Sequence, residues 1–195
     1  MKSTLGLDIG SHTIKLVEIS QDNSGPSLLA AGAAATPPKA LQSSVPADTE
    51  AIAVTVKKLA KDLAITTTDV NMALPESQVF TRIISVPQLS TRELTSAIKW
   101  EAEQYVPLPL DQVSVDFSIL RDSRETGKNT MDVLLVACPK TLVEKYISIL
   151  SMSGLSPVAM ETEIIATSRA LARSAPTSRH IMVVSLGAQT TDVAI

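Results

Sequence analysis

Two short segments far apart in the sequence carry the same arrangement of residues that could do chemistry. Residues 8–15 read DIGSHTIK, and residues 185–192 read SLGAQTTD. Gly10 aligns with Gly187, and Thr13 aligns with Thr190. Each segment follows an apolar run and opens another, as expected for a strand, a glycine turn and a second strand. The repeat predicts a duplicated architecture with two similar hairpins facing one ligand.

A glycine turn of this kind suits a phosphate group. Glycine allows the backbone to approach a ligand closely, and successive backbone N–H groups can then point into one concavity and hold an anion. Hydroxyl groups would add donors, and a lysine would add positive charge. The candidate phosphate-binding residues are Asp8, Gly10, Ser11, His12, Thr13 and Lys15 in the first segment and Gly187, Ala188, Gln189 and Thr190 in the second.

Asp8 stands at the end of its predicted strand, where it would face a Mg²⁺ ion. Mg²⁺ gives up its water reluctantly, so we expect this carboxylate to act through bound water. Ordinary hairpin turns also use Asp and Gly, so a single such segment is weak support and the repeat is what strengthens it. His12 and Lys15 are equally compatible with a solvated turn residue and a surface lysine. His180 has no cysteine or histidine at ligand spacing, so we expect it to be structural or exposed.

The composition favours a globular α/β protein. Hydrophobic residues make up 45% of the 195 residues and aromatic residues only 3%, so the core must consist of aliphatic side chains. That mixture suits strands that are covered on both faces. The net charge of -3 argues against nucleic acid as a main partner.

The same sequence predicts a reduced, cytoplasmic protein. Cys138 is the single cysteine, and we expect it to be a small core residue at the end of a strand. The N-terminus lacks the apolar core of a signal peptide, and the apolar stretch at 28–35 is too short to span a bilayer. Contact with a membrane is therefore expected only indirectly, through a partner. The chain ends inside an apolar run at Ile195, so we expect a fragment of a longer protein.

Hydrophobic periodicity and turn residues predict the elements that must position these segments. Asp48 is the expected N-cap of the first helix, and Ser90 with Glu93 forms a capping box for the second. The segment at 86–160 reads as a β-α-β-β-α-β unit. The predicted strands are 3–9, 13–19, 27–36, 70–74, 79–86, 113–117, 131–137, 156–160 and 180–186, and the predicted helices are 49–64, 90–105, 139–153 and 161–173.

Trp100 lies on the predicted 90–105 helix, away from its apolar face. Helical spacing places Leu94, Ile98, Ala102 and Tyr105 on that face. An exposed tryptophan is typical of an interface. It is equally compatible with packing under a neighbouring loop.

The two glycine segments resemble the first and second phosphate motifs of the actin, sugar-kinase and Hsp70 superfamily. Within that superfamily the sequence resembles the PilM family of type IV pilus assembly proteins, over nearly the whole chain. The segments that carry this narrower resemblance are 81–87 (TRIISVP), 101–107 (EAEQYVP), 134–140 (LLVACPK) and 154–157 (GLSP), followed by Glu161 and 166–169 (ATSR).

The resemblance implies an actin-like (ribonuclease H-like) α/β fold, with an inserted subdomain placed as in the cell-division protein FtsA. Subdomain 1A would comprise 1–85 and 161–179, the inserted α+β subdomain 1C would comprise 86–160, and 180–195 would begin subdomain 2A. ATP and Mg²⁺ would lie between the two halves of the complete fold.

The same resemblance implies the partners. The protein would be a scaffold that binds the N-terminal cytoplasmic peptide of the inner-membrane protein PilN, in a groove near the junction of 1A and 1C. It would thereby reach other inner-membrane pilus assembly proteins, at the inner face of the bacterial inner membrane. Whether it forms a homo-oligomer stays open.

One departure from the family pattern concerns catalysis. The second phosphate motif usually begins with Asp, and Ser185 stands there in this sequence. A carboxylate near the γ-phosphate helps to place metal and water, so we expect at most weak ATPase activity and assign no catalytic residue. The adenosine motif of the family would follow Ile195, so this chain is expected to bind ATP weakly or not at all by itself. The alternatives are an FtsA-like, filament-forming cell-division protein and, less favoured, a small-molecule kinase.

Overall fold

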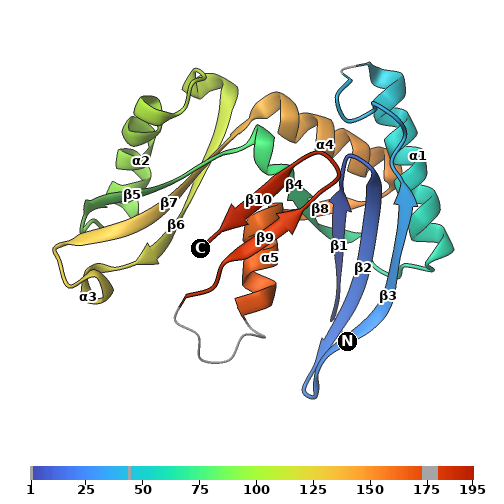
Figure 1. The fold of residues 1–195 in the computed structure, drawn as a ribbon, viewed down its shortest axis with the longest axis horizontal. Helices are drawn as coiled ribbons and strands as arrows, with labels where there is room; N and C mark the ends of the chain where they lie inside the picture. Colours follow the sequence, from blue (N-terminus) through green and yellow to red (C-terminus); the bar gives the residue numbers. More distant parts are fainter. Residues whose placement is uncertain (1, 44, 173–179) are drawn as a thin grey trace. The chain divides into compact units, whose positions relative to one another are not determined.

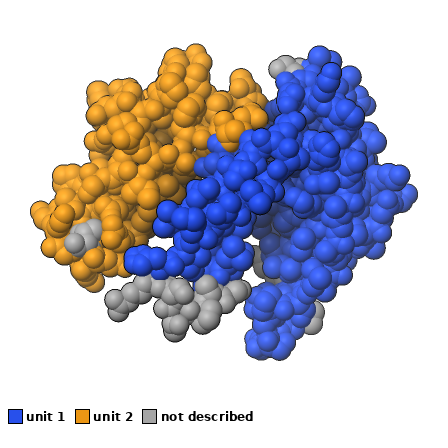
Figure 2. Space-filling view, in the orientation of Figure 1, with its two compact units in different colours: residues 1–76, 145–195 blue, residues 77–144 orange. Residues whose placement is uncertain are grey.

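The computed structural model describes residues 2–43, 45–172 and 180–195. Contacts divide the chain into two compact units (Figure 2). Unit 1 comprises Met1–Glu76 and Lys145–Ile195, and unit 2 comprises Ser77–Glu144. Both glycine segments belong to unit 1.

A five-stranded mixed sheet forms the centre of unit 1, with the strand order β3-β2-β1-β4-β8 (Figure 1). The first three strands form an antiparallel meander because only short turns join them, whereas β4 and β8 run parallel to β1 after longer connections. The strands are β1 (Lys2–Ile9), β2 (Thr13–Asp22), β3 (Gly25–Ala35), β4 (Asp69–Leu74) and β8 (Ser156–Thr162).

Alternating side chains give this sheet a buried apolar face. Leu5, Leu7 and Ile9 of β1 are each at most 2% exposed, and Ile14 and Leu16 of β2 are fully buried. Helix α1 (Pro46–Asp62) contacts β2 and β3, and contributes buried residues of its own to the core. Helix α5 (Glu163–Ala172) contacts β4, β8 and the separate hairpin of β9 (Val183–Leu186) and β10 (Thr191–Ala194).

The buried carboxylate of Glu18, on β2, binds the segment that connects α1 and β4. Glu18 is 1% exposed and accepts hydrogen bonds from the hydroxyl of Thr66 at 2.5 Å and its backbone N–H at 3.1 Å. Burial by itself would raise the pKa of Glu18, but the hydrogen bonds from Thr66 hold it below its ordinary value. The carboxylate is therefore satisfied in its charged form.

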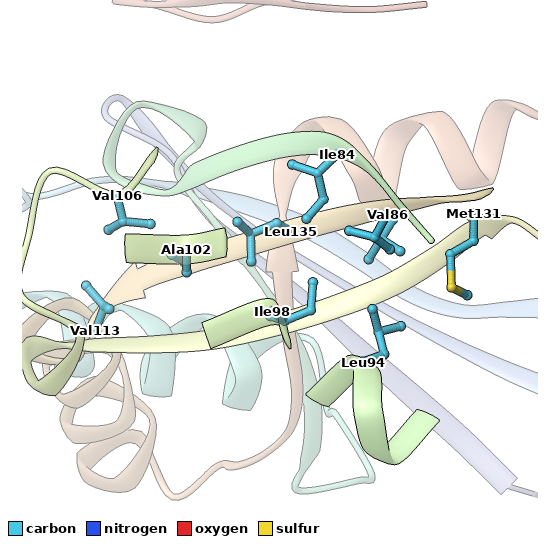
Figure 3. Packing of buried hydrophobic residues seen from close by; sticks show 11 residues of the cluster. Ile84, Val86, Leu94, Ile98, Ala102, Val106, Val113, Met131 and Leu135 are labelled. Carbon is cyan, nitrogen blue, oxygen red and sulfur yellow. The ribbon is translucent and has the colours of Figure 1, made fainter. Parts of the chain in front are cut away.

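Unit 2 consists of a three-stranded antiparallel sheet and one long helix. The strand order is β5 (Phe80–Pro87), β7 (Thr130–Pro139) and β6 (Val113–Arg121). Helix α2 (Thr91–Tyr105) turns Leu94, Ile98 and Ala102 towards the sheet, and Figure 3 shows these side chains beside those of the strands. The remaining elements are η1 (Glu76–Gln78), η2 (Leu110–Gln112), α3 (Ser123–Thr126) and α4 (Lys140–Ser153), which begins in unit 2 and continues in unit 1.

Helix α2 confirms the predicted capping box. The backbone N–H of Ser90 donates to Oε2 of Glu93 at 2.9 Å, and the backbone N–H of Glu93 donates to Oγ of Ser90 at 3.4 Å. Trp100 is 72% exposed, which favours the first of the two alternatives left open for it, whereas Tyr105 is 38% exposed and lies partly outside the predicted apolar face. Tyr105 instead stacks with Arg82, whose guanidinium carbon lies 4.0 Å from the ring centroid.

Two local predictions were wrong. Helix α1 begins at Pro46, with Val45 as its N-cap, so Asp48 lies in the first turn rather than at the cap. Proline suits this position because its fixed φ is already helical and its missing N–H has no partner to lose there. The strand predicted at 156–160 is present as β8, but its assignment to the β-α-β-β-α-β unit at 86–160 was wrong, because it pairs with β4 in the sheet of unit 1. The subdomain boundaries at 85, 160 and 179 stay predictions.

Among the described residues, no helix is both long and apolar enough to span a bilayer.

The capping box makes a measurable contribution to the stability of unit 2. We expect Ser90→Ala to lower the free energy of unfolding by about 1 kcal/mol, because the substitution removes the acceptor for an otherwise unpaired helix N–H. Ser96→Ala, in the middle of the same helix, is the control and should change it by less than about 0.5 kcal/mol. Urea denaturation followed by the fluorescence of Trp100 measures both variants. Equal losses would show that the cap contributes nothing specific.

Candidate functional site

The two glycine turns have the same local geometry. The backbone N–H of Gly10 donates to the carbonyl of Thr13 at 3.0 Å, and that of Gly187 donates to the carbonyl of Thr190 at 2.8 Å. A Cβ atom added to either glycine would lie 3.0 Å from that same carbonyl oxygen. Both turns join paired antiparallel strands. The repeated sequence therefore corresponds to a repeated structure.

The first hairpin carries a paired lysine and carboxylate beside its turn. Asp8 and Lys15 face each other in the strand register, and Nζ of Lys15 lies 2.8 Å from Oδ2 of Asp8. The other oxygen, Oδ1, is buried and has no hydrogen-bond partner among the described residues. A buried carboxylate oxygen without a partner is costly, so this atom is available for a ligand.

The second hairpin carries its carboxylate on the opposite strand. Ser185 takes the place of Asp8 in the repeat, and the residue that faces Ser185 in the register is Asp192. Asp192 thus occupies the position that Lys15 occupies in the first hairpin. Our sequence reasoning considered only the start of the second motif and missed Asp192, although the end of the same repeat contains it.

Glu163, in the first turn of α5, connects the two hairpins electrostatically. The pKa of Glu163 is raised to about 7, chiefly by burial and then by the neighbouring carboxylates of Asp8 and Asp192, while Lys15 opposes them and Glu76 adds a smaller effect. Because the charges of both Asp8 and Asp192 affect the pKa of Glu163, the ends of the two hairpins lie within electrostatic reach of this one residue. Nothing in the local sequence distinguishes Glu163, so sequence reasoning missed it.

The other predicted residues of the two turns lie at the surface. Ser11, His12 and Thr13 are exposed in the first turn, and Ala188 and Thr190 are exposed in the second. Gln189 is also exposed, and its side-chain oxygen accepts a hydrogen bond from Nε2 of Gln42 at 3.3 Å. The predicted turn residues therefore lie at the surface and not in the core.

Such a cluster of carboxylates fits a hydrated magnesium ion better than a metal held directly by protein. Within residues 2–43, 45–172 and 180–195, no three acidic, histidine or cysteine side chains lie close enough together to hold a metal. Mg²⁺ commonly keeps several waters and shares phosphate oxygens with one or two carboxylates. The free oxygen of Asp8 suits that arrangement.

Two residues that sequence reasoning set aside lie outside this cluster. His180 is exposed, as predicted. Cys138 is buried at the end of β7, as predicted, and burial raises the pKa of its thiol to about 11. The thiol is therefore protonated at neutral pH and unreactive.

Comparison with known proteins identifies the family. The family model described as type IV pilus assembly protein PilM matches residues 6–195. A chain of the solved PilM–PilN type IV pilus biogenesis complex is 32% identical, with a TM-score of 0.87. The match covers 97% of this chain and 56% of the other, so this chain spans little more than half the length of that relative.

More distant solved structures share the fold alone. The cytoplasmic domain of EpsL, an inner membrane component of the type II secretion system of Vibrio cholerae, is 14% identical with a TM-score of 0.59, over 99% of this chain and 71% of that one. A protein of unknown function with an actin-like ATPase fold, from Bacteroides thetaiotaomicron, is 11% identical with a TM-score of 0.53, over 98% and 64%. The fold of this chain is therefore actin-like, and the chain belongs to the family of the type IV pilus assembly protein PilM.

Proposed function

We propose that this protein is a nucleotide-binding scaffold of type IV pilus assembly, and that it binds the N-terminal cytoplasmic peptide of PilN. The observation that carries this proposal is the similarity to the PilM–PilN complex, at 32% identity over 97% of the chain. Through PilN the protein would reach other inner-membrane pilus assembly proteins and be held at the cytoplasmic face of the inner membrane.

The paired turns support the nucleotide part of the proposal. Two turns that each leave little room for a side chain at their glycine lie beside the carboxylates of Asp8 and Asp192, and Glu163 lies within electrostatic reach of both. Phosphate groups of ATP would accept hydrogen bonds from the exposed backbone and hydroxyl groups of the turns. Mg²⁺, when bound, would neutralise the charge between the phosphates and these carboxylates.

The residues present favour binding over rapid hydrolysis. Ser185 offers no negative charge to place a metal or an attacking water. Asp192, on the facing strand, supplies a carboxylate to the same hairpin and so offsets part of that loss. Lys15 is engaged with Asp8 and balances its charge. We therefore propose that nucleotide serves mainly to set the conformation of the scaffold.

The peptide part of the proposal rests on an exposed strand edge. Strand β5 lies at one edge of the three-stranded sheet, and its Ile83 is 62% exposed. An extended peptide can add to such an edge through backbone hydrogen bonds, with apolar side chains providing specificity. The segment 81–87 belongs to the sequence that carries the family resemblance. The PilN peptide is therefore proposed to pair along β5.

Calorimetric titration with a peptide that copies the cognate PilN N-terminus tests this proposal. We expect saturable one-to-one binding to the full-length protein, with an affinity that changes when Mg-ATP is present. Ile83→Asp should weaken binding about tenfold or more, because it places a charge on the proposed contact. Ile119→Asp is the matched control on β6, the opposite edge of the sheet, where Ile119 is 43% exposed. Failure of the peptide to bind with and without Mg-ATP would refute the assignment of PilN as partner.

The raised pKa of Glu163 gives a second test, which concerns the carboxylate cluster. The pKa lies at about 7 in the folded protein against an ordinary value of 4.5, so ionisation costs stability as the pH rises through this window. Glu163→Gln cannot ionise. We therefore expect the variant to have a free energy of unfolding roughly 1–2 kcal/mol higher than that of wild type at pH 8, after a reduction for solvent screening. At pH 4.5 we expect little difference between the two proteins.

Thermal unfolding across this pH range measures the effect. Mg²⁺ should stabilise the wild type at pH 8 more than it stabilises the variant, because the ion offsets repulsion between ionised carboxylates. Glu50→Gln, on the exposed surface of α1, is the control for replacing a carboxylate by an amide. A pH-independent effect of Glu163→Gln would contradict the electrostatic description of the cluster.

A further inference from the structure

Thr36, directly after β3, is bound to the first glycine turn. Its backbone N–H donates to the carbonyl of His12 at 3.0 Å, and its hydroxyl donates to the carbonyl of Gly10 at 2.7 Å. Thr36 is 8% exposed, so these hydrogen bonds are largely protected from water. One residue therefore holds two of the carbonyl groups of the turn.

The direction of these carbonyls determines the direction of the neighbouring N–H groups. The peptide bonds of the described residues are all trans, and in a planar trans peptide the C=O and the following N–H point in opposite directions. Because the carbonyls of Gly10 and His12 point towards Thr36, the N–H groups of Ser11 and Thr13 point away from it. Ser11 and Thr13 are exposed residues of the turn, so these two N–H groups are the candidate donors for a ligand there.

Thr36 also changes the electrostatics of the turn. A carbonyl oxygen carries partial negative charge and would repel a phosphate placed beside it. Two donors from Thr36 cover both oxygens and leave the positive ends of the peptide dipoles on the other side.

The segment that follows Thr36 is fixed at its far end and reaches the second turn. Nζ of Lys145, on α4, donates to the carbonyls of Leu41 at 2.7 Å and Ser43 at 2.8 Å, with a longer contact to Ala40 at 3.4 Å. Between these anchors, the side chain of Gln42 donates to Gln189 of the second turn. The segment 36–43 thus contacts the first turn, the second turn and α4.

We propose that Thr36 is a positioning residue for phosphate binding at the first turn. We further propose that the segment 36–43, anchored by Lys145, holds the two turns at a fixed position relative to each other. The proposal rests on the nucleotide-binding function proposed above. It assigns a role to residues outside both glycine motifs. Thr36 does not contact the ligand itself but orients the backbone donors that do.

The test compares Mg-ATP affinity in Thr36→Val and Thr36→Ser, read from the amide chemical shifts of Ser11 and Thr13, because this readout detects weak binding. Thr36→Val removes the hydroxyl donor at nearly constant volume, and we expect the dissociation constant to rise about tenfold. Thr36→Ser keeps the hydroxyl and should restore binding to within about threefold of wild type. Thr55→Val is the matched control, since its hydroxyl also donates to a backbone carbonyl, that of Ala51 at 2.9 Å in α1.

Lys145→Met is a second variant that leaves Thr36 intact and should also weaken binding several-fold. Its control is Lys140→Met, which removes a single contact to the carbonyl of Asp111. The positioning role is overturned if the wild type binds Mg-ATP and both Thr36→Val and Lys145→Met bind it equally well. All variants are made in the full-length protein, and if the full-length wild type shows no shifts up to millimolar Mg-ATP while it remains folded, the nucleotide function itself fails and the positioning role fails with it. Adenosine, which lacks phosphate, should leave these amides unshifted.

Discussion

The close approach of backbone to backbone at two glycine turns is the constraint on which the rest of the site depends. At Gly10 and Gly187 a side chain would bring its Cβ to 3.0 Å from a carbonyl oxygen of the same turn, a distance that real Cβ atoms rarely reach. Any side chain at these positions would require the facing carbonyl to shift, so glycine suits turns that close in this way. Because both turns close alike, the strands on either side keep the same register, which places Asp8 opposite Lys15 and Ser185 opposite Asp192.

The balance of charge around the turns follows from that register. Lys15 neutralises one oxygen of Asp8, and the other oxygen remains buried without a partner in the described part of the chain. Glu163 shares the region with Asp8 and Asp192, and its raised pKa reflects first its burial and then the cost of a further negative charge beside these carboxylates. An anionic ligand alone would add to this repulsion. A hydrated cation between phosphate and carboxylates would relieve it, and this is the physical reason to associate Mg²⁺ with the site.

Much of the fold could be predicted from the sequence, because local patterns determined it. The glycine repeat predicted two matching hairpins, and the spacing of Ser90 and Glu93 predicted a capping box that the structure contains. The errors arose where a second local signal in the sequence outweighed the one on which the prediction was based. Pro46 starts α1 two residues before Asp48, so the expected cap became a first-turn residue.

The site itself was less predictable, because distant segments complete it. Glu163 and Thr36 belong to no recognisable motif, and they reach the first hairpin only through the folding of α5 and the end of β3. Asp192 was within reach of sequence reasoning, since it ends the second copy of the repeat. The pairing of β8 with β4 likewise depends on tertiary structure, and the order of elements along the chain does not determine it.

The central claim is that the two turns bind the phosphates of one nucleotide together. The direct test is titration of the isotopically labelled full-length protein with Mg-ATP, followed by the amide chemical shifts of Gly10 and Gly187. We expect both amides to shift along the same saturation curve, with one dissociation constant. Two different curves, or a response at only one turn, would contradict the claim that the duplicated hairpins form a single site.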